Sequence, residues 1–136
     1  MQSATLQVCP AFLSHGFDGF IEFLRDQEAG PSTLSPKRFG DVLSIDVQTL
    51  ATQAHVHRNT ISRSPASESV QKFLREALRV MRAAYDLSGD VGRAIFWYRN
   101  EPLPPFGYKT AEQLVSEGRT EDVLRYVGSL EAGAAG

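Results

Sequence analysis

Polar side chains that can recognise the edges of DNA bases are gathered in one short stretch of this 136-residue chain. An arginine can donate two parallel hydrogen bonds to guanine, an asparagine can bond adenine in both senses, and a serine can reach a base or a phosphate. The stretch holds these types around Ile61, which the spacing predicts to point inward. We predict that six of its side chains contact DNA: His57, Arg58, Asn59, Thr60, Ser62 and Arg63.

The residues before this stretch predict the helix that must position it. Apolar residues recur on one helical face, at Val47, Leu50, Ala51 and Ala54. Asp46 is placed to cap this helix, Ala51 lets a second helix cross closely, and Val56 fills the turn, which is the pattern of a helix-turn-helix. His55 stands where glycine is commonest, so we expect a left-handed backbone there at some cost. The alternative interpretation is an αα-corner with an ordinary solvated surface.

The net charge is only −2, but the charge is distributed unevenly along the chain. Residues 35–82 carry eight basic and four acidic side chains, and this cationic section contains the predicted helix-turn-helix. Four of the basic residues form a row on the long helix expected after it: Lys72, Arg75, Arg79 and Arg82. This row suits contact with DNA phosphates, although a solvated face paired through Glu76 explains it equally well.

Several function classes fit the composition poorly. Cys9 is the only cysteine, so an internal disulfide is excluded and a reducing cytoplasm is favoured. The N-terminus lacks a basic leader and no apolar run reaches eighteen residues, so we expect neither secretion nor a membrane span. No acidic or cysteine cluster accompanies the histidines at metal-ligand spacing, and no glycine loop could cradle a phosphate. We expect a cytoplasmic protein that is not an enzyme, without catalytic residues, metal or cofactor.

Helical spacing predicts an all-α chain in three parts. Residues 1–34 form an arm expected to be partly ordered, with a strand at Leu6 and Val8 and a helical stripe from Phe17 to Leu24 that docks on the main body or on a partner. Residues 35–85 form the helix-turn-helix domain, opened by Ser35 and Pro36, with a long connecting helix that begins near residue 66 or 67. The expected apolar row of this helix comprises Val70, Phe73, Leu74, Ala77, Leu78, Met81 and Tyr85.

Residues 86–136 form a second, small helical domain. Asp90 caps its first helix, prolines hold residues 101–107 in an extended loop with a turn at Gly107, and Thr110 and Gln113 have capping-box spacing. The first helix buries Val91, Ala94, Ile95 and Tyr98, a face that Phe96 and Trp97 enlarge. The last helix starts at Thr120, buries Val123, Leu124, Val127 and Leu130, and frays from Ala132.

The second domain carries a recognisable order of patterns. A helix ends in Trp97-Tyr98-Arg99-Asn100, a Pro/Leu loop follows, and Gly107-Tyr108-Lys109-Thr110-Ala111-Glu112-Gln113-Leu114 leads to an acidic-glycine pair and a Val-Leu helix that ends in Gly133. Together with the helix-turn-helix before it, the chain over residues 35–133 resembles the Xre/MbcA/ParS toxin-binding antitoxin family. The resemblance implies a DNA-binding domain joined to a toxin-binding domain, usually as a homodimer, that represses its own operon. The neutralised toxin is typically a RES-domain protein that destroys NAD.

By position, the helix end, the loop and the next helix start correspond to the toxin-binding signature of that family. Residues on irregular structure can reach a partner, and we assign toxin contact to Asn100, Leu103, Phe106, Tyr108 and Lys109. A proline-constrained loop also loses little entropy on binding. We expect Trp97, Leu114 and Leu124 to hold the core. The equally weighted alternative is that Asn100 caps its helix and Phe106 folds inward.

The resulting hypothesis is the antitoxin of a type II toxin-antitoxin pair, which occludes its toxin and binds operator DNA. The alternative is a simple helix-turn-helix transcriptional regulator without a toxin partner. A third hypothesis is a toxin-binding adaptor whose helix-turn-helix has lost DNA binding, which fits the net acidity and His55 in the turn.

Overall fold

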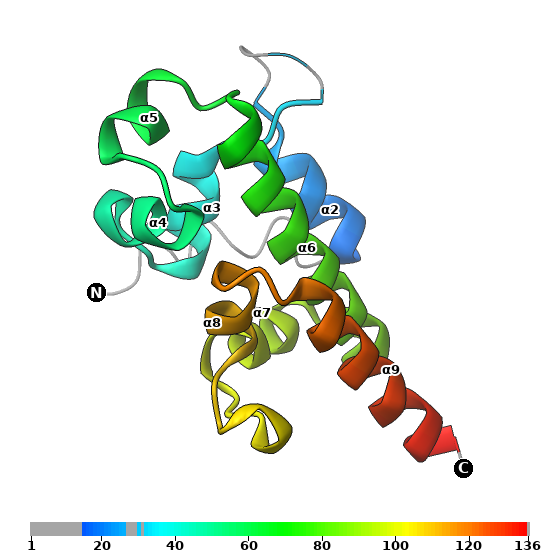
Figure 1. Ribbon diagram of the computed structural model, residues 1–136. Helices are drawn as coiled ribbons and strands as arrows, with labels where there is room; N and C mark the ends of the chain where they lie inside the picture. The colour runs from blue at the N-terminus through cyan, green and yellow to red at the C-terminus, as the bar shows by residue number, and fades with distance from the viewer. Residues whose placement is uncertain (1–14, 27–29, 31, 136) are drawn as a thin grey trace. The chain divides into compact units, whose positions relative to one another are not determined.

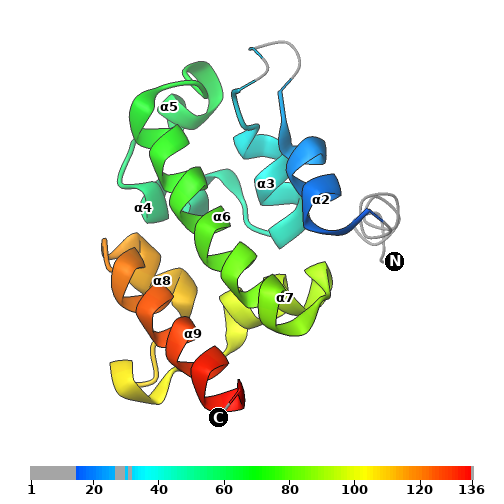
Figure 2. The same ribbon diagram turned by 90° about the vertical axis from the view of Figure 1, so that its right-hand side faces the viewer.

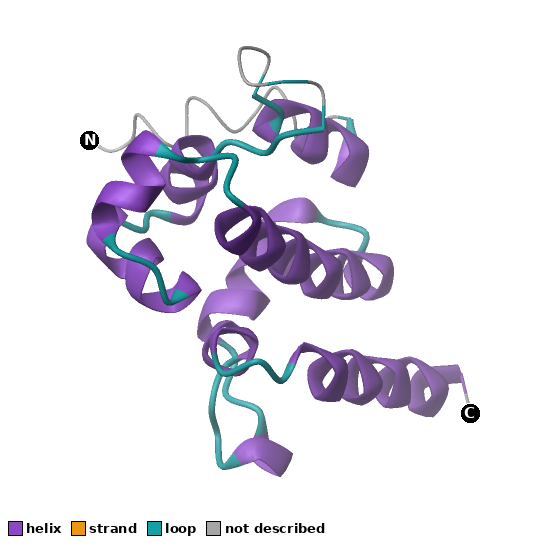
Figure 3. Cartoon of the chain, turned by 45° about the horizontal axis from the view of Figure 1, so that its top comes forward, coloured by secondary structure: helices purple, strands orange, loops and turns teal. Residues whose placement is uncertain are grey.

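The computed structural model describes residues 15–26, 30 and 32–135 of the chain. Helices make up 74 % of these residues, and the described part contains no strand (Figure 3), which confirms the all-α prediction. The strand predicted at Leu6 and Val8 lies outside the described residues. Contacts divide the chain into two compact units, one ending at Leu74 and one beginning at Arg75. The three-part division expected from the sequence stays a prediction.

The described part of the first unit consists of four short helices and the start of a long one. They are α2 (Gly16–Leu24), α3 (Pro36–Leu43), α4 (Val47–Ala54), α5 (Arg58–Arg63) and the beginning of α6 (Glu68–Ser88). Neighbours along the chain touch one another, α2 with α3, α3 with α4 and α4 with α5, as Figure 1 and Figure 2 show. Helix α6 begins at Glu68, one or two residues later than predicted. Its apolar row is buried as predicted except for Tyr85, which is half-buried.

Helix α2 docks on α3 through rings and through one arginine. Phe17 and Phe20 are buried and meet edge to face, with ring centroids 5.5 Å apart. Arg38 of α3 donates to the Phe23 carbonyl at 2.8 Å, and its guanidinium lies over the Phe23 ring. The predicted helical stripe and its docking are therefore confirmed for the described part of the arm.

The corner between α3 and α4 is unusually tight at Gly40. Ser35 caps α3 as predicted, accepting a hydrogen bond from the Arg38 N–H at 3.1 Å. At the other end Ser44 adopts a left-handed conformation, with φ 60°, and the Ile45 N–H donates to the Gly40 carbonyl at 2.8 Å. A Cβ on Gly40 would stand 2.8 Å from the Ile45 carbonyl oxygen, so a side chain at this position would force the corner to shift.

A buried glutamine joins two connections of the first unit. Gln71 of α6 donates to the Leu34 carbonyl and accepts from the Leu34 N–H, at 2.8 and 2.9 Å. Its amide also donates to the Pro65 carbonyl at 2.8 Å. The segment before α3 and the segment after α5 are therefore held by the same side chain, which satisfies backbone groups that would otherwise be buried unpaired.

The second unit comprises the rest of α6 and the helices that follow it. They are α7 (Val91–Asn100), a 3-10 turn η1 (Pro104–Phe106), α8 (Ala111–Ser116) and α9 (Thr120–Ala135). The capping box of Thr110 and Gln113 is present as predicted, and Asp90 caps α7 by accepting from the Arg93 N–H. Arg79 bonds Glu121 at 2.9 Å and so links α6 to α9. Arg99 bonds Glu112 at 3.0 Å and links α7 to α8.

Four expectations for the second unit are wrong. Phe96 is 66 % exposed, because it lies two positions from buried Tyr98 and residues so spaced point to nearly opposite sides of a helix. The loop after α7 is not fully extended, since the prolines that exclude an α-helix allow the short η1 turn. Helix α9 continues through Ala135 rather than loosening from Ala132, and Leu130 on it is exposed.

Candidate functional site

The α4–α5 pair is built on the cap and the small residue that the sequence predicts. The Thr49 N–H donates to the Asp46 carboxylate at 2.7 Å, and this bond holds the Asp46 pKa below its ordinary value. Leu50 and Ala51 are buried on the inner face of α4. With no side chain beyond its Cβ, Ala51 lets α5 pack close to α4, and the two helices are in contact.

The turn between the helices has the left-handed residue that was predicted. His55 has φ 59° and ψ 41°, a backbone conformation that is strained for any residue other than glycine. The next residue closes the turn, because the Val56 N–H donates to the Ala51 carbonyl at 3.0 Å. His57 then caps α5, its Nδ1 accepting from the Asn59 N–H at 3.1 Å, which leaves Nε2 to donate to a partner.

Helix α5 presents the predicted polar side chains outward. Ile61 is its buried anchor, only 5 % exposed. Thr60 is half-buried, and the remaining candidates are exposed: His57, Arg58, Asn59, Ser62 and Arg63. The structure thus brings all six residues to one short element with a single apolar attachment.

The head groups on α5 are not committed to intramolecular bonds. Within the described part of the chain, the guanidinium groups of Arg58 and Arg63 take part in no ion pair, and the side-chain amide of Asn59 makes no hydrogen bond. By contrast, Arg79 on α6 bonds Glu121 and also Glu76, and these bonds raise the pKa of its guanidinium. The head groups of α5 are therefore available as donors.

The basic row on α6 is partly neutralised. Besides the two bonds of Arg79, Arg82 lies 3.8 Å from Asp86. Local pairing, which was the alternative to phosphate contact, therefore accounts for part of this row. Lys72 at the start of α6 is exposed and is the member of the row nearest in sequence to α5.

Two residues of the predicted α4 face are not fully buried. Val47, the first residue of α4, is 40 % exposed, and Ala54 at the other end is half-buried. Helical spacing predicted a buried face that includes Val47, but the described residues cover this side chain only in part. The partly exposed Val47 side chain lines a cavity.

No family model matches the chain, and neither does any curated protein or solved structure. The resemblance to the Xre/MbcA/ParS family therefore stays an expectation that rests on the residues quoted for it.

The residues expected to contact a toxin divide into three kinds. Leu103 is 1 % exposed and presents no surface to a partner. Asn100 donates to the Phe96 carbonyl of its own helix at 3.1 Å, and Phe106 packs edge to face on Tyr126 of α9, as the alternative interpretation supposed. Tyr108 and Lys109 are exposed, and Lys109 pairs with Glu117 at 2.8 Å.

Tyr108 is the most available of these residues, and its backbone is strained. Its side chain is 68 % exposed and makes no hydrogen bond or ring contact with any described residue. The backbone φ is 67°, directly after Gly107 at the same angle. A left-handed conformation costs a bulky residue about 1–2 kcal/mol. Among the described residues, no hydrogen bond or ring contact of the Tyr108 side chain offsets this cost.

The other expected core residues of the second unit are only partly confirmed. Leu114 is fully buried, whereas Trp97 and Leu124 are half-buried. Glu112 was missed, although it is nearly buried and paired with Arg99. No pattern in the sequence marks such a pair, because its partners stand on different helices. The described residues contain no group of three or more His, Cys, Asp or Glu that could hold a metal ion, and none of their helices is long and apolar enough to cross a membrane.

Proposed function

We propose that this chain is a DNA-binding antitoxin of a type II toxin-antitoxin pair. In this proposal the α4–α5 pair is a helix-turn-helix that binds operator DNA and represses the operon of the chain, and the second unit binds and occludes a RES-type, NAD-degrading toxin. The DNA-binding part is supported by one observation above all: α5 is anchored by Ile61 and exposes polar head groups with no intramolecular partner.

Unpaired donors matter because a paired guanidinium would have to break its ion pair before it could bind a base. Arg58 and Asn59 stand in the first turn of α5, and the N-terminal residues of a recognition helix are those that reach base edges. Each bidentate contact gives about 1–3 kcal/mol of discrimination against the wrong base. As a homodimer, the chain would present two such helices about one DNA turn apart, roughly 34–36 Å, to a near-palindromic operator.

The DNA-binding part is tested by fluorescence anisotropy with the promoter DNA of the chain's own operon. Arg58→Ala should weaken binding about 10- to 100-fold and relax the preference at one base pair. Arg93→Ala is the matched control, because it removes the same charge from an exposed position on α7. Binding should also weaken steeply with salt. Equal losses for the two variants, or no binding to the promoter, would reject the assigned face.

The toxin-binding part is supported by the resemblance and by the surface around Tyr108. Its test is co-expression with the protein encoded beside this chain, with growth and co-purification as readouts. Tyr108→Ala should weaken the complex, while Phe96→Ala, which removes another exposed ring outside the contact set, should not. If the neighbour is neither toxic nor bound, the chain is better explained as a simple transcriptional regulator without a toxin partner.

A further inference from the structure

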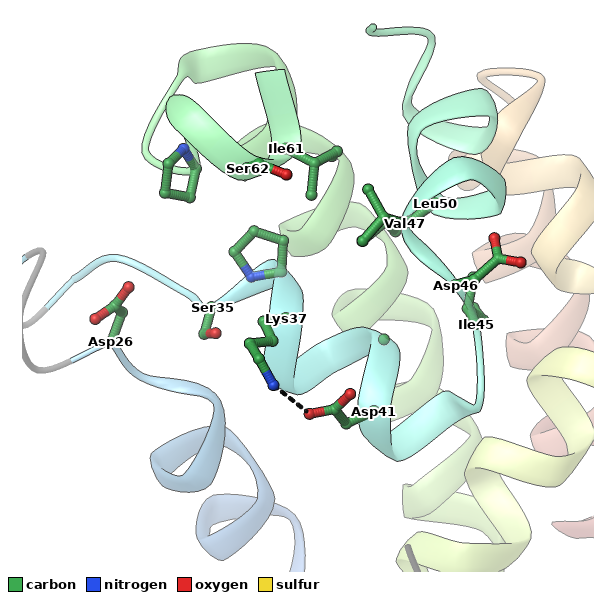
Figure 4. Close-up of a pocket in the computed structure, with 13 residues that line it drawn as sticks. Asp26, Ser35, Lys37, Asp41, Ile45, Asp46, Val47, Leu50, Ile61 and Ser62 are labelled. Carbon is green, nitrogen blue, oxygen red and sulfur yellow. Dashed lines mark hydrogen bonds and ion pairs between the residues drawn. The ribbon is translucent and has the colours of Figure 1, made fainter. Parts of the chain in front are cut away.

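The first unit contains a cavity of about 640 Å³ among α3, α4 and α5. This size lies within the range of about 300–1,000 Å³ that small-molecule sites occupy. Figure 4 shows Val47 of α4 and Ile61 of α5 facing each other across it. Ser62 also lines the cavity, so one wall belongs to the helix that carries the candidate base-reading residues.

One part of the cavity wall is apolar and partly exposed. Leu50 and Ile61 are buried behind it, whereas Val47 is 40 % exposed. An exposed valine on a convex surface is ordinary, but a concave apolar wall gains more from being covered, because a ligand there removes water from several side chains at once. The cavity therefore favours an occupant with an apolar body.

The charges around the cavity determine the sign of that occupant. Lys37 is the basic residue of the lining, and its ammonium lies 3.3 Å from the Asp41 carboxylate, which balances it. Asp26 and Asp46 also line the cavity, so the formal charge of the lining is −2. The Thr49 N–H keeps the pKa of Asp46 below its ordinary value, so that carboxylate stays ionised near neutral pH. A cation is attracted here and an anion is repelled.

We propose that this cavity is a binding site for a small organic cation with an apolar body, whose hydrocarbon part covers Val47 and whose ammonium group faces the carboxylates. Binding as such does not depend on the proposed function. If α5 reads DNA, an occupant that touches Ile61 and Ser62 contacts the reading helix directly, and the site would then be an effector site.

The test is a titration of the full chain, followed by the backbone amide resonances in two-dimensional NMR spectra, with phenethylammonium as the probe. Two probes of the same shape serve as comparisons, neutral 2-phenylethanol and anionic phenylacetate. We expect saturable shifts centred on Val47, Leu50 and Ile61, with affinity falling from the cation to the alcohol to the anion. Scattered shifts, no saturation or the same affinity for all three probes would overturn the proposal.

Charge variants at the cavity sharpen the test. Lys37→Gln makes the lining more negative and should strengthen phenethylammonium binding, whereas Asp41→Asn should weaken it, each about threefold for a charge roughly 6 Å away in water. Glu131→Gln, on exposed surface of α9, changes the net charge equally and should change nothing. If the same resonances shift with protein concentration in the absence of any probe, a second copy of the chain covers the cavity and the proposal fails.

Discussion

Replacing Gly40 by alanine should destabilise the chain even though glycine is a poor helix former. Gly40 lies inside α3, where alanine is ordinarily about 1 kcal/mol more favourable. A Cβ at this position would lie 2.8 Å from the Ile45 carbonyl oxygen, well inside the 3.4 Å at which ordinary contact begins. The sign of the change therefore depends on whether the corner between α3 and α4 can open.

The structure indicates that the corner resists opening. Ile45 is tied to Gly40 itself, since its N–H donates to the Gly40 carbonyl at 2.8 Å, so moving the Ile45 oxygen away strains that bond. Ile45 is also buried in the core of the first unit. Overpacking of this kind costs about 1–3 kcal/mol. After the helix propensity gain of about 1 kcal/mol, we expect a net loss of about 0–2 kcal/mol in the free energy of unfolding.

Gly128→Ala is the matched control. Gly128 also lies inside a helix, but a Cβ there would meet nothing within 4 Å. Gly128→Ala should therefore raise the free energy of unfolding by about 1 kcal/mol, the full difference in helix propensity between glycine and alanine. Urea unfolding followed by far-UV circular dichroism measures both variants, and they should differ by about 1–3 kcal/mol. If Gly40→Ala stabilises the chain as much as Gly128→Ala does, the corner relaxes freely and the close approach has no energetic weight.

Three further predictions concern other positions. Tyr98→Phe should raise the free energy of unfolding by about 1 kcal/mol, because the buried Tyr98 hydroxyl has no hydrogen-bond partner among the described residues and burial raises its pKa; an unchanged or lower melting temperature would contradict this. The Asp46 pKa is lowered in the folded state, so the contribution of its carboxylate to the free energy of unfolding is complete above the unfolded pKa and is lost as the pH falls through the folded pKa. Asn also caps a helix but does not titrate, so Asp46→Asn should lose less stability than the unchanged chain when the pH is lowered. Tyr108→Gly should raise the melting temperature, because it relieves about 1–2 kcal/mol of backbone strain. This gain exceeds the entropic cost of about 0.4–1 kcal/mol that arises because glycine makes the unfolded chain more flexible. Gly107→Ala, which puts a side chain at a left-handed position, should lower the melting temperature.

Much of the local structure of this chain is encoded locally and could be predicted. The caps at Ser35, Asp46 and Thr110 each depend on one polar side chain that satisfies free N–H groups within its own helix. The left-handed turn at His55 follows from the length of the connection between two helices, whatever residue stands there. Ile61 is the sole apolar side chain within α5, so its burial also follows from the sequence.

The remaining features depend on contacts between distant segments. Gln71 is polar and gives no sign of burial until the Leu34 and Pro65 backbones are brought beside it. Leu103 lies in a proline loop, where exposure was the natural expectation, yet its backbone pairs with Lys109 and its side chain is buried. Val47 lies on the apolar face of α4 but remains 40 % exposed. Helical spacing shows which residues share a face, but it does not show whether another element packs against each of them.

Helix α6 has one consequence for the cooperativity of unfolding. The two compact units divide between Leu74 and Arg75, but both residues lie inside this 21-residue helix. Breaking the helix there would leave four N–H and four C=O groups without their helical partners. Melting of either unit is therefore transmitted along a shared hydrogen-bonded backbone, and amide protons on both sides of this division should exchange with solvent at similar rates.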